Sequence, residues 1–388
     1  MKFSHLEFKD VKGVGSIEVD FTPDKRVHVF IGENGVGKTK FLEALFQVYF
    51  YTNIQVEEIF AFSSAFDLND FKESTKSNLV FSTLLVDKYS SPIQLLREPY
   101  ETVKKFDFFP DGEFFKPHNY PIIFVSAKNR SFVQNTTEKE IKGLANFSER
   151  RRRHIELLLL GMENEFSMLN MNVDIEQWFI SIAQSSNPFQ KQEDNREIEI
   201  RTVLKLFNQI DKSIDSNFME IRGDNRVFLK INDQKIKLSH LSTGYSSILK
   251  IIQSIISGYG YFTNEQQLQH VRGVVFIDEI ESHLHLSWQS KIIPTLKELF
   301  PNTTFYITTH SPVVLIQLEE GEAYRLQREE DGVVRSSIVR QPSNISFIDL
   351  QKQAFDLDLN KIKREQMSAD GQKEANQALL DLLNEEAS

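Results

Sequence analysis

The segment Gly32–Thr39 (GENGVGKT) has the residue types and spacing that hold the phosphates of a nucleotide. In the pattern G-x4-G-K-T, the glycines let the backbone turn tightly and direct its N–H groups at phosphate oxygens. Lys38 is then placed to reach the β- and γ-phosphates, and Thr39 to ligate Mg²⁺. The residues expected to contact ATP here are Gly32, Glu33, Asn34, Gly35, Val36, Gly37, Lys38, Thr39 and Lys40.

Two adjacent carboxylates, Asp278 and Glu279, follow the apolar run Gly273–Ile277, which predicts a buried strand. Ligands of open α/β sheets bind at the carboxyl ends of the strands. We therefore expect Asp278 to hold Mg²⁺ and Glu279 to polarise the attacking water. A third predicted strand, Thr303–Thr308, leads to His310, whose ring can hydrogen-bond a γ-phosphate. Lys38, Glu279 and His310 are the candidate catalytic residues.

The segment Leu241–Tyr245 (LSTGY) opens a strongly apolar predicted helix. Ser242 has the residue type of a helix N-cap. The alternative is that Ser242, Thr243 and Gly244 bind a γ-phosphate at the helix N-terminus. Sequence alone leaves both interpretations open.

Predicted strands and helices flank these residues and must hold them in place. Arg26–Ile31 predicts a buried strand before the glycine-rich loop, and an apolar stripe from Phe41 predicts a helix after it. The strand-rich start, together with Leu79–Val86, Ile93–Arg97 and Pro121–Val125, predicts a lateral antiparallel sheet. Helices are expected over Glu138–Asn187 and from about Ile198 to Ile214, strands over Phe218–Leu238, and a hairpin around Glu330–Gly332.

In this order, the segments resemble an ABC-class ATPase of the SMC-like and OLD-like (overcoming-lysogenisation-defect) branch. Met1–Phe21 resembles the first strands of that branch, and IDEIESHLHLSWQ (Ile277–Gln289) resembles its catalytic segment, with Leu286 where proline is typical. The resemblance implies an α/β fold: an ABC-type P-loop ATPase head with a lateral antiparallel β-sheet and a helical insertion. It also implies ATP and Mg²⁺ as ligands.

The resemblance assigns Glu279 as catalytic base and His310 as switch histidine. It implies that Ser242 and Gly244 act in trans on ATP held by a neighbouring chain, so the expected assembly is a homodimer or higher homo-oligomer. The expected organisation is an N-terminal half of the head over 1–128, a helical insertion over 129–216, a C-terminal half over 217–345 and a helical tail over 346–388.

Some positions depart from the branch. The segment LSTGY replaces the transporter-type LSGGQ, and the glutamine that usually contacts Mg²⁺ has three candidate substitutes, Gln94, Ser126 and Asn129. Glu281, His283 and His285 form an alternative metal set, although their place after Glu279 matches the helix start of the branch. In the tail, Asp356-Leu357-Asp358 has the D-x-D pattern of a Toprim nuclease. We expect it to lie in a helix and expect no nuclease in this chain, because too few residues follow residue 340.

The composition, 40% hydrophobic and 26% charged in 388 residues, is that of a globular protein with one large domain and an insertion, or with two domains. We expect no membrane span, no signal peptide and, because there is no cysteine, a cytoplasmic location. The net charge of −10 disfavours binding of DNA by the whole surface. The run Arg150–Arg153 is either a solvated helix face or a contact for nucleic acid or an acidic protein.

The resemblance leaves the biological task open between three readings. One is the ATPase subunit of a bacterial antiphage defence system of the PARIS, Septu, retron-associated or Gabija kind, a sensor or regulator that controls a separate nuclease or toxin. The alternative is a DNA-repair or recombination ATPase of the SMC or RecF type, against which the acidic charge and the short insertion weigh. A transporter ATPase is disfavoured by the lack of LSGGQ.

Overall fold

The computed structural model describes residues 4–62, 80–81, 83–86, 93–94, 117–128, 130–131, 145–164, 166–169, 174–187, 189–191, 193–358 and 360–361. The chain divides into two compact units, Met1–Ser343 and Asn344–Ser388. Of the second unit, the structure describes helix α11 (Phe347–Phe355), which Ser346 caps by accepting a hydrogen bond from the Asp349 amide. Within the described part of the chain, no helix combines the length and apolarity that a membrane span needs.

The first unit is built on one large mixed sheet. Its strands, in spatial order, are β5 (Ile93–Gln94), β4 (Thr83–Val86), β1 (His5–Val11), β2 (Gly15–Asp20), β13 (Val334–Ile338), β12 (Ala323–Arg328), β3 (Val27–Ile31), β11 (Thr304–Thr308), β10 (Val274–Ile277) and β6 (Ile122–Val125). The strands from β12 to β6 run parallel to one another, and β5, β4, β1 and β2 form an antiparallel lateral part. The α/β class and the lateral sheet predicted from the sequence are confirmed.

One strand that was predicted to belong to the lateral sheet lies in the parallel part instead. Pro121–Val125 contains β6, which pairs with β10 in parallel, with Val274 opposite Ile122. All four residues of β6 are buried, as is usual for a parallel strand covered on both faces. Its continuous apolar run therefore marks the parallel core rather than a half-exposed antiparallel strand.

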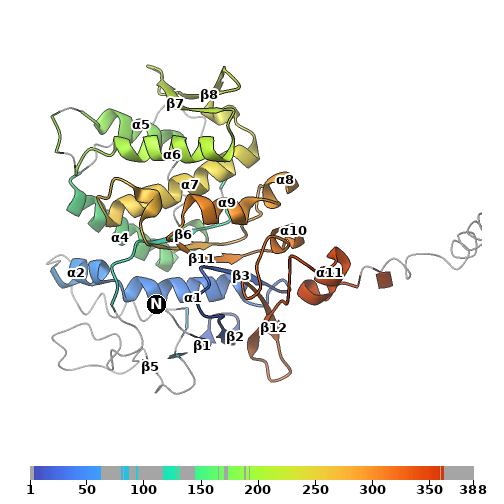
Figure 1. The fold of residues 1–388 in the computed structure, drawn as a ribbon. Helices are drawn as coiled ribbons and strands as arrows, with labels where there is room; N and C mark the ends of the chain where they lie inside the picture. The colour runs from blue at the N-terminus through green and yellow to red at the C-terminus, as the bar shows by residue number, and fades with distance from the viewer. Residues whose placement is uncertain are drawn as a thin grey trace, which may run out of the picture. The chain divides into compact units, whose positions relative to one another are not determined.

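Helices cover both faces of the sheet in layers (Figure 1). Helix α1 (Lys38–Tyr51) packs on β11, β1 and β6, and α7 (Thr243–Phe262) packs on β6 from the other side. Beyond α7 lie α6 (Glu197–Ile210) and α5 (Ile175–Ser185), and these carry a small antiparallel sheet. The remaining helices in the described residues are α2 (Ile54–Phe62), α4 (Phe147–Asn164), α8 (Leu286–Gln289), α9 (Ile292–Leu299) and α10 (Pro312–Leu315), with 3₁₀ turns at Phe166–Met168, Leu238–His240 and Leu268–His270.

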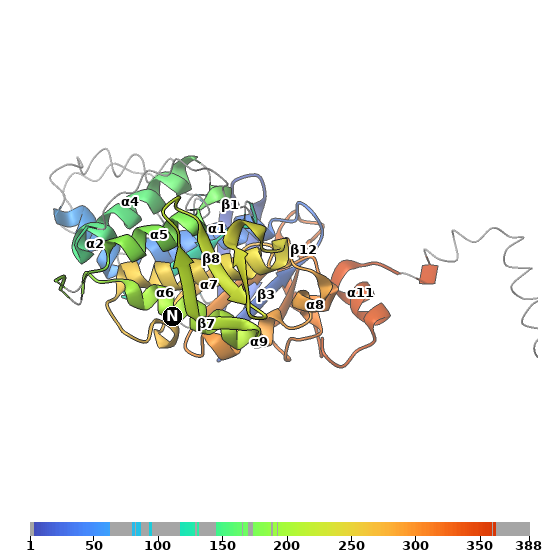
Figure 2. The ribbon, with the colours of Figure 1, turned by 90° about the horizontal axis from the view of Figure 1, so that it is seen from above.

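The small sheet consists of β7 (Ile214–Ile221), β8 (Val227–Ile231) and β9 (Gln234–Lys237). Viewed from above, β7 and β8 cross over α6 (Figure 2). These strands and the β12–β13 hairpin confirm the sequence prediction. The helix expected to reach Ile214 ends instead at Ile210, and Ile214 already pairs with Ile231 in the sheet.

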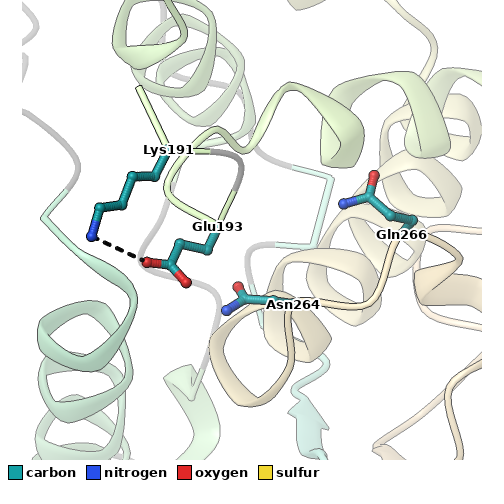
Figure 3. Close-up of a pocket in the computed structure, with 4 residues that line it drawn as sticks. All are labelled: Lys191, Glu193, Asn264 and Gln266. Carbon is teal, nitrogen blue, oxygen red and sulfur yellow. Dashed lines mark ion pairs between the residues drawn. The ribbon is translucent and has the colours of Figure 1, made fainter. Parts of the chain in front are cut away.

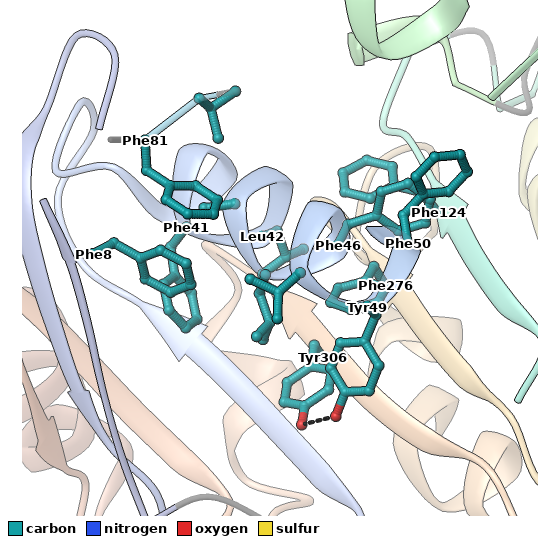
Figure 4. Close-up of a cluster of buried hydrophobic side chains, with 14 of the residues drawn as sticks. Phe8, Phe41, Leu42, Phe46, Tyr49, Phe50, Phe81, Phe124, Phe276 and Tyr306 are labelled. Carbon is teal, nitrogen blue, oxygen red and sulfur yellow. Dashed lines mark hydrogen bonds between the residues drawn. The ribbon is translucent and has the colours of Figure 1, made fainter. Parts of the chain in front are cut away.

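The core explains much of the phenylalanine usage. Along α1, Phe41, Phe46 and Phe50 point into clusters formed by strand residues on both sides (Figure 4). Phe46 meets the rings of Phe124 and Phe276 edge to face, each at a centroid distance of 5.5 Å. Apolar residues of α4 join this core, so this helix of the predicted insertion packs on the head. The sequence also contains a cluster of phenylalanines, Phe106, Phe108, Phe109, Phe114 and Phe115, which lies outside the described residues.

The D-x-D pattern lies at the end of α11 rather than inside a helix. Asp356 is the C-cap of α11, with φ 57°, and Asp358 accepts a hydrogen bond from the Lys361 amide. The prediction that this pattern sits within a helix is therefore wrong, because the left-handed residue ends the helix before Asp358.

Candidate nucleotide site

The glycine-rich loop joins β3 to α1, as predicted. Gly37 is the N-cap of α1 with φ 112°, and a Cβ atom there would lie 2.7 Å from Cγ1 of Val14. Gly32 has φ 148°, and a Cβ atom there would lie 2.4 Å from the carbonyl oxygen of Leu326. Both positions therefore require glycine. At the tip of the loop, Glu33, Asn34 and Gly35 are exposed.

Lys38 is held against this loop. Its Nζ donates hydrogen bonds to the carbonyl oxygens of Gly32 and Glu33, both at 2.9 Å. Burial lowers the pKa of Lys38 to about 8. The ammonium group is thus hydrogen-bonded to neutral carbonyl oxygens of the loop. Charged phosphate oxygens would form stronger hydrogen bonds with it. Lys40 instead pairs with the buried Glu43, at 2.6 Å.

Thr39, Asp278 and Thr308 converge at the carboxyl end of the parallel strands. The Thr39 hydroxyl lies 3.0 Å from Oδ1 of Asp278, and the Thr308 hydroxyl donates to the same oxygen at 2.6 Å. Burial raises the pKa of Asp278, and the two threonine hydrogen bonds oppose that shift. Thr308 was not among the site residues predicted from the sequence. The signal available was a hydroxyl at the end of a strand next to Asp278.

Glu279 has an unusual backbone conformation, with φ 46°. Its amide donates to the Thr308 hydroxyl at 2.8 Å, and its carboxylate accepts a hydrogen bond from the Ser282 hydroxyl at 2.9 Å. Non-glycine residues in the left-handed region are uncommon and concentrate at functional sites. Ser282 thus holds the carboxylate, and Thr308 holds the backbone that carries it.

Glu281 holds the segment that carries His310. One carboxylate oxygen accepts a hydrogen bond from the His310 amide and the other from the Thr309 hydroxyl, each at 2.6 Å. Burial, followed by the charge of Lys38, lowers the pKa of His310. Two residues of the alternative metal set have other partners here. Glu281 binds the segment that follows β11, and His285 caps α8 by accepting a hydrogen bond from the Ser287 amide.

Arg130 is a further residue that sequence reasoning missed. It follows β6 and is 1% exposed. Its guanidinium donates to carbonyl oxygens of Ser126 and of the segment Asp278–Ile280. An isolated arginine in a loop gives no periodic signal, so the sequence offered no reason to place it beneath Asp278.

Ser242 is the N-cap of α7, as one sequence interpretation expected, and its hydroxyl accepts from the Tyr245 amide at 3.4 Å. Ser242 and Thr243 are exposed, whereas Gly244 is buried beside Trp288. Tyr245 hydrogen-bonds Asp211 through its hydroxyl. The helix N-terminus and the exposed Ser242 and Thr243 side chains are thus available to a partner molecule.

Of the candidates for the missing glutamine, Asn129 and the side chain of Gln94 lie outside the described residues. The hydroxyl of Ser126 donates to the carbonyl oxygens of Phe166 and Leu169 and is buried. Ser126 therefore has partners in the 3₁₀ turn rather than at Asp278.

The donor set at Asp278 fits Mg²⁺. Hard oxygen ligands are what this ion prefers, and it is commonly held by one or two carboxylates together with substrate phosphates. Asp278 supplies a carboxylate and Thr39 a hydroxyl in direct contact with it. Because the Thr39 hydroxyl and the Asp278 carboxylate are in contact, their oxygen atoms lie close enough together to bind one shared ion.

The arginine run is divided among contacts within the chain. Arg150 is buried and donates to the carbonyl oxygens of Ala145 and Glu193, and Arg151 lies over the Phe147 ring at 4.5 Å. Arg152 and Arg153 pair with Glu156 and Glu149, one turn away. The solvated-face interpretation therefore holds for Arg152 and Arg153 but not for Arg150.

A surface depression of about 510 Å³ lies elsewhere, lined by Lys191, Glu193, Asn264 and Gln266 (Figure 3). Lys191 and Glu193 form an ion pair of 3.9 Å across part of it. None of these residues belongs to the phosphate loop or to the Asp278 cluster, so the depression is separate from the nucleotide site.

This arrangement, with a glycine-rich loop between β3 and α1 and an Asp-Glu pair at the end of β10, two strands away in the sheet, defines a P-loop ATPase. A family profile described as "AAA domain, putative AbiEii toxin, Type IV TA system" matches residues 121–316. The chain belongs to this family.

Similar proteins include two described as Septu protein PtuA. The one from Bacillus mycoides (strain KBAB4) is 26% identical over 341 residues, covering 84% of this chain and 40% of that protein. The one from Bacillus thuringiensis is 24% identical over 350 residues, covering 88% and 79%. This chain thus spans less than half of the first relative. The Escherichia coli "Retron Ec83 probable ATPase" is 32% identical over 117 residues, covering 28% and 22%.

Solved structures similar to the chain include an SmcHead bound to the C-winged helix domain of ScpA. It is 14% identical, with a TM-score of 0.45, covering 89% of this chain and 100% of that one. The SMC head domain from Thermotoga maritima is 16% identical, with a TM-score of 0.38 and coverage of 88% and 100%.

Proposed function

We propose that the chain is a Mg²⁺-dependent ATPase that converts ATP and water to ADP and phosphate. The observation that carries this proposal is the contact between Thr39 and Asp278, whose side chains meet at 3.0 Å although 239 residues separate them. It brings the phosphate loop and the catalytic strand end to one point. A glycine-rich loop without such a partner would bind anions but would not assemble a metal site.

The residues have distinct roles in this proposal. Backbone N–H groups of Gly32–Thr39 and the ammonium of Lys38 bind the phosphates. Thr39 and Asp278 hold the metal, which when bound neutralises charge on phosphate oxygens. Glu279 accepts a proton from the attacking water, in the orientation that Ser282 and Thr308 give it. His310 hydrogen-bonds the γ-phosphate from the adjacent strand end.

The second half of each site would come from another copy of the chain. Ser242, Thr243 and Gly244 would contact the γ-phosphate of ATP bound to the partner. The exposure of Ser242 and Thr243 at the start of a 20-residue helix supports this role. One chain has one phosphate loop and one such segment, so two complete sites require a head-to-tail dimer.

We further propose that this ATPase is the sensor or regulatory subunit of an antiphage defence system and controls a separate nuclease or toxin. The similarity to Septu PtuA proteins and to a retron ATPase supports this assignment. The SMC or RecF-type repair function has weaker support. The net charge of −10 weighs against it, and Arg150 of the arginine run, which could have contacted nucleic acid or an acidic protein, is engaged within the chain.

The test is the solution mass of E279Q protein with and without ATP and Mg²⁺, with K38A as control. E279Q keeps the size and hydrogen bonds of the side chain but lacks a base, so it should trap an ATP-bound dimer. K38A should show no change with ATP. A protein that stays monomeric in every condition would contradict the trans role of Ser242–Gly244, and equal ATP turnover by wild type and E279Q would contradict the role of Glu279.

A further inference from the structure

Arg130 is among the largest fully buried side chains of the described residues, at 1% exposure. It lies in the loop that leaves β6. Its Nη1 donates to the carbonyl oxygens of Glu279 and Ile280 at 3.0 and 3.3 Å, and its Nη2 to that of Asp278 at 2.5 Å. Three consecutive carbonyl groups after β10 therefore converge on one guanidinium.

The same guanidinium also binds its own loop. Nε and Nη2 donate to the carbonyl oxygen of Ser126 at 3.3 and 3.0 Å. Because β6 and β10 are adjacent parallel strands, Arg130 ties together the two loops that leave their carboxyl ends. The rigid fork of donors makes arginine suited to bind several acceptors at fixed angles.

A buried cation is costly unless opposite charges compensate it. Within the described residues, the hydrogen bonds of Arg130 go to carbonyl oxygens, and its compensating charges are the nearby carboxylates of Asp278, Glu281 and Glu279. Replacing a buried charge by an apolar side chain of similar volume is often neutral or stabilising, so stability alone does not account for Arg130. The contacts instead fix a backbone segment in which Glu279 has φ 46°.

We infer that Arg130 is a positioning residue for ATP hydrolysis. By holding the carbonyl groups of Asp278, Glu279 and Ile280, it sets the backbone from which the Glu279 carboxylate reaches the attacking water. Among the described residues, its hydrogen bonds go to the two loops after β6 and β10 and not to the phosphate loop. This inference rests on the ATPase function proposed above and adds to it a residue that acts through the backbone.

The experiment compares R130M and R130K with wild type, using R196M as a matched control. Arg196 is 4% exposed and pairs with the buried Glu199. It is the N-cap residue of α6, in a different part of the fold from Asp278. R130M removes the donors at similar length, and R130K retains a charge that can reach one or two of the carbonyl groups. For each protein one measures the melting temperature, the Kd for ATP with Mg²⁺, and kcat and KM, below the lowest melting temperature.

We expect R130M to lose roughly ten- to a hundredfold in kcat, because small misplacement of a reacting group has effects of that size. Its Kd for ATP should stay within about threefold of wild type, since the phosphate loop is untouched. R130K should recover part of the lost kcat. R196M should lower the melting temperature but leave kcat unchanged.

Three results would overturn the inference. The first is hydrolysis of ATP by R130M at the wild-type rate. The second is a fall in its kcat no larger than that of R196M at equal loss of melting temperature. The third is a loss of affinity for ATP as large as the loss of kcat. If R130M does not fold, R130K decides in the same way. Wild-type protein without ATP turnover would instead overturn the proposed function, and the role of Arg130 with it.

Discussion

The Thr308 hydroxyl lies between Asp278 and Glu279 and serves both. It donates to Oδ1 of Asp278 at 2.6 Å and accepts from the amide of Glu279 at 2.8 Å. A single side chain at the end of β11 thus fixes the expected metal ligand and the backbone of the expected base. Neither contact could be made by an apolar side chain of the same shape.

Replacing Thr308 with valine tests this relationship. T308V leaves the partly buried amide of Glu279 without its acceptor, which should cost about 1 kcal/mol or more of unfolding free energy. It should also lower kcat roughly tenfold or more, because Glu279 shifts. T308S retains the hydroxyl and should keep most of both. Denaturant unfolding and phosphate release check the two effects, and a fully active T308V would refute the orienting role.

Ser242 can be tested without removing the helix cap. Asn and Asp cap helices about as well as Ser, so S242N and S242D should melt within a few degrees of wild type. Only Asp adds a negative charge beside the γ-phosphate of a partner chain. In an E279Q background, ATP should therefore still drive dimerisation of S242N but not of S242D. Dimers of both variants in the same mass measurement would exclude a phosphate contact at Ser242.

Glu281 should act through the His310 segment. E281A removes the acceptors for the His310 amide and the Thr309 hydroxyl, whereas E281Q keeps one neutral acceptor. We expect kcat to fall roughly tenfold in E281A and less in E281Q, with ATP affinity little changed. Steady-state kinetics together with direct ATP titration separates the two quantities. A wild-type kcat for E281A would mean that His310 needs no such support.

Acid should destabilise the fold through its buried histidines. Burial lowers the pKa of His154 to about 3 and those of His28 and His118 to about 4. The unfolded chain binds protons below about pH 6.5 while the folded chain excludes them. Stability is therefore intact above pH 6.5 and falls as pH drops toward 4, by up to about 1.4 kcal/mol per pH unit for each histidine.

H154F isolates one of these groups. His154 stacks on Tyr261 at 4.1 Å, and a phenyl ring can take the same place. Between pH 6 and 4, H154F should lose about 1 kcal/mol less per pH unit than wild type, with similar stability at pH 7.5. Urea unfolding at these pH values measures the difference. Parallel pH dependence in the two proteins would show that His154 is not buried in its neutral form.

The sequence predicted those parts of the site whose chemistry depends on local order. A phosphate loop is contiguous, and Asp278 and Glu279 follow a recognisable buried strand, so both could be located from residue pattern alone. The roles of Thr308, Glu281 and Arg130 depend on which strands become neighbours in the sheet. The order of the strands, with β11 and β6 on either side of β10, cannot be predicted from the residue pattern of any single segment.

The misassigned strand has the same origin. Ile122–Val125 gives an apolar run that fits an antiparallel or a parallel strand, and only pairing with β10 decides between them. The end of α6 was misplaced because Ile210 and Ile214 continue the same helical spacing, while pairing of Ile214 with Ile231 draws it into the small sheet. In each case a long-range contact overrode a local pattern.

The position of β13 has a consequence for how the chain folds during synthesis. β13 joins the lateral strands to the parallel core, pairing Val334 with Ile17 and Leu326 of β12 with Ser336. The β1–β2 hairpin is therefore synthesised more than 300 positions before the strand that becomes its inner neighbour. Contacts of such sequence separation form slowly, and until they form the edge of β2 is open to incorrect pairing. Truncation of the chain before residue 334 should thus leave a species prone to aggregation and not merely a shorter ATPase.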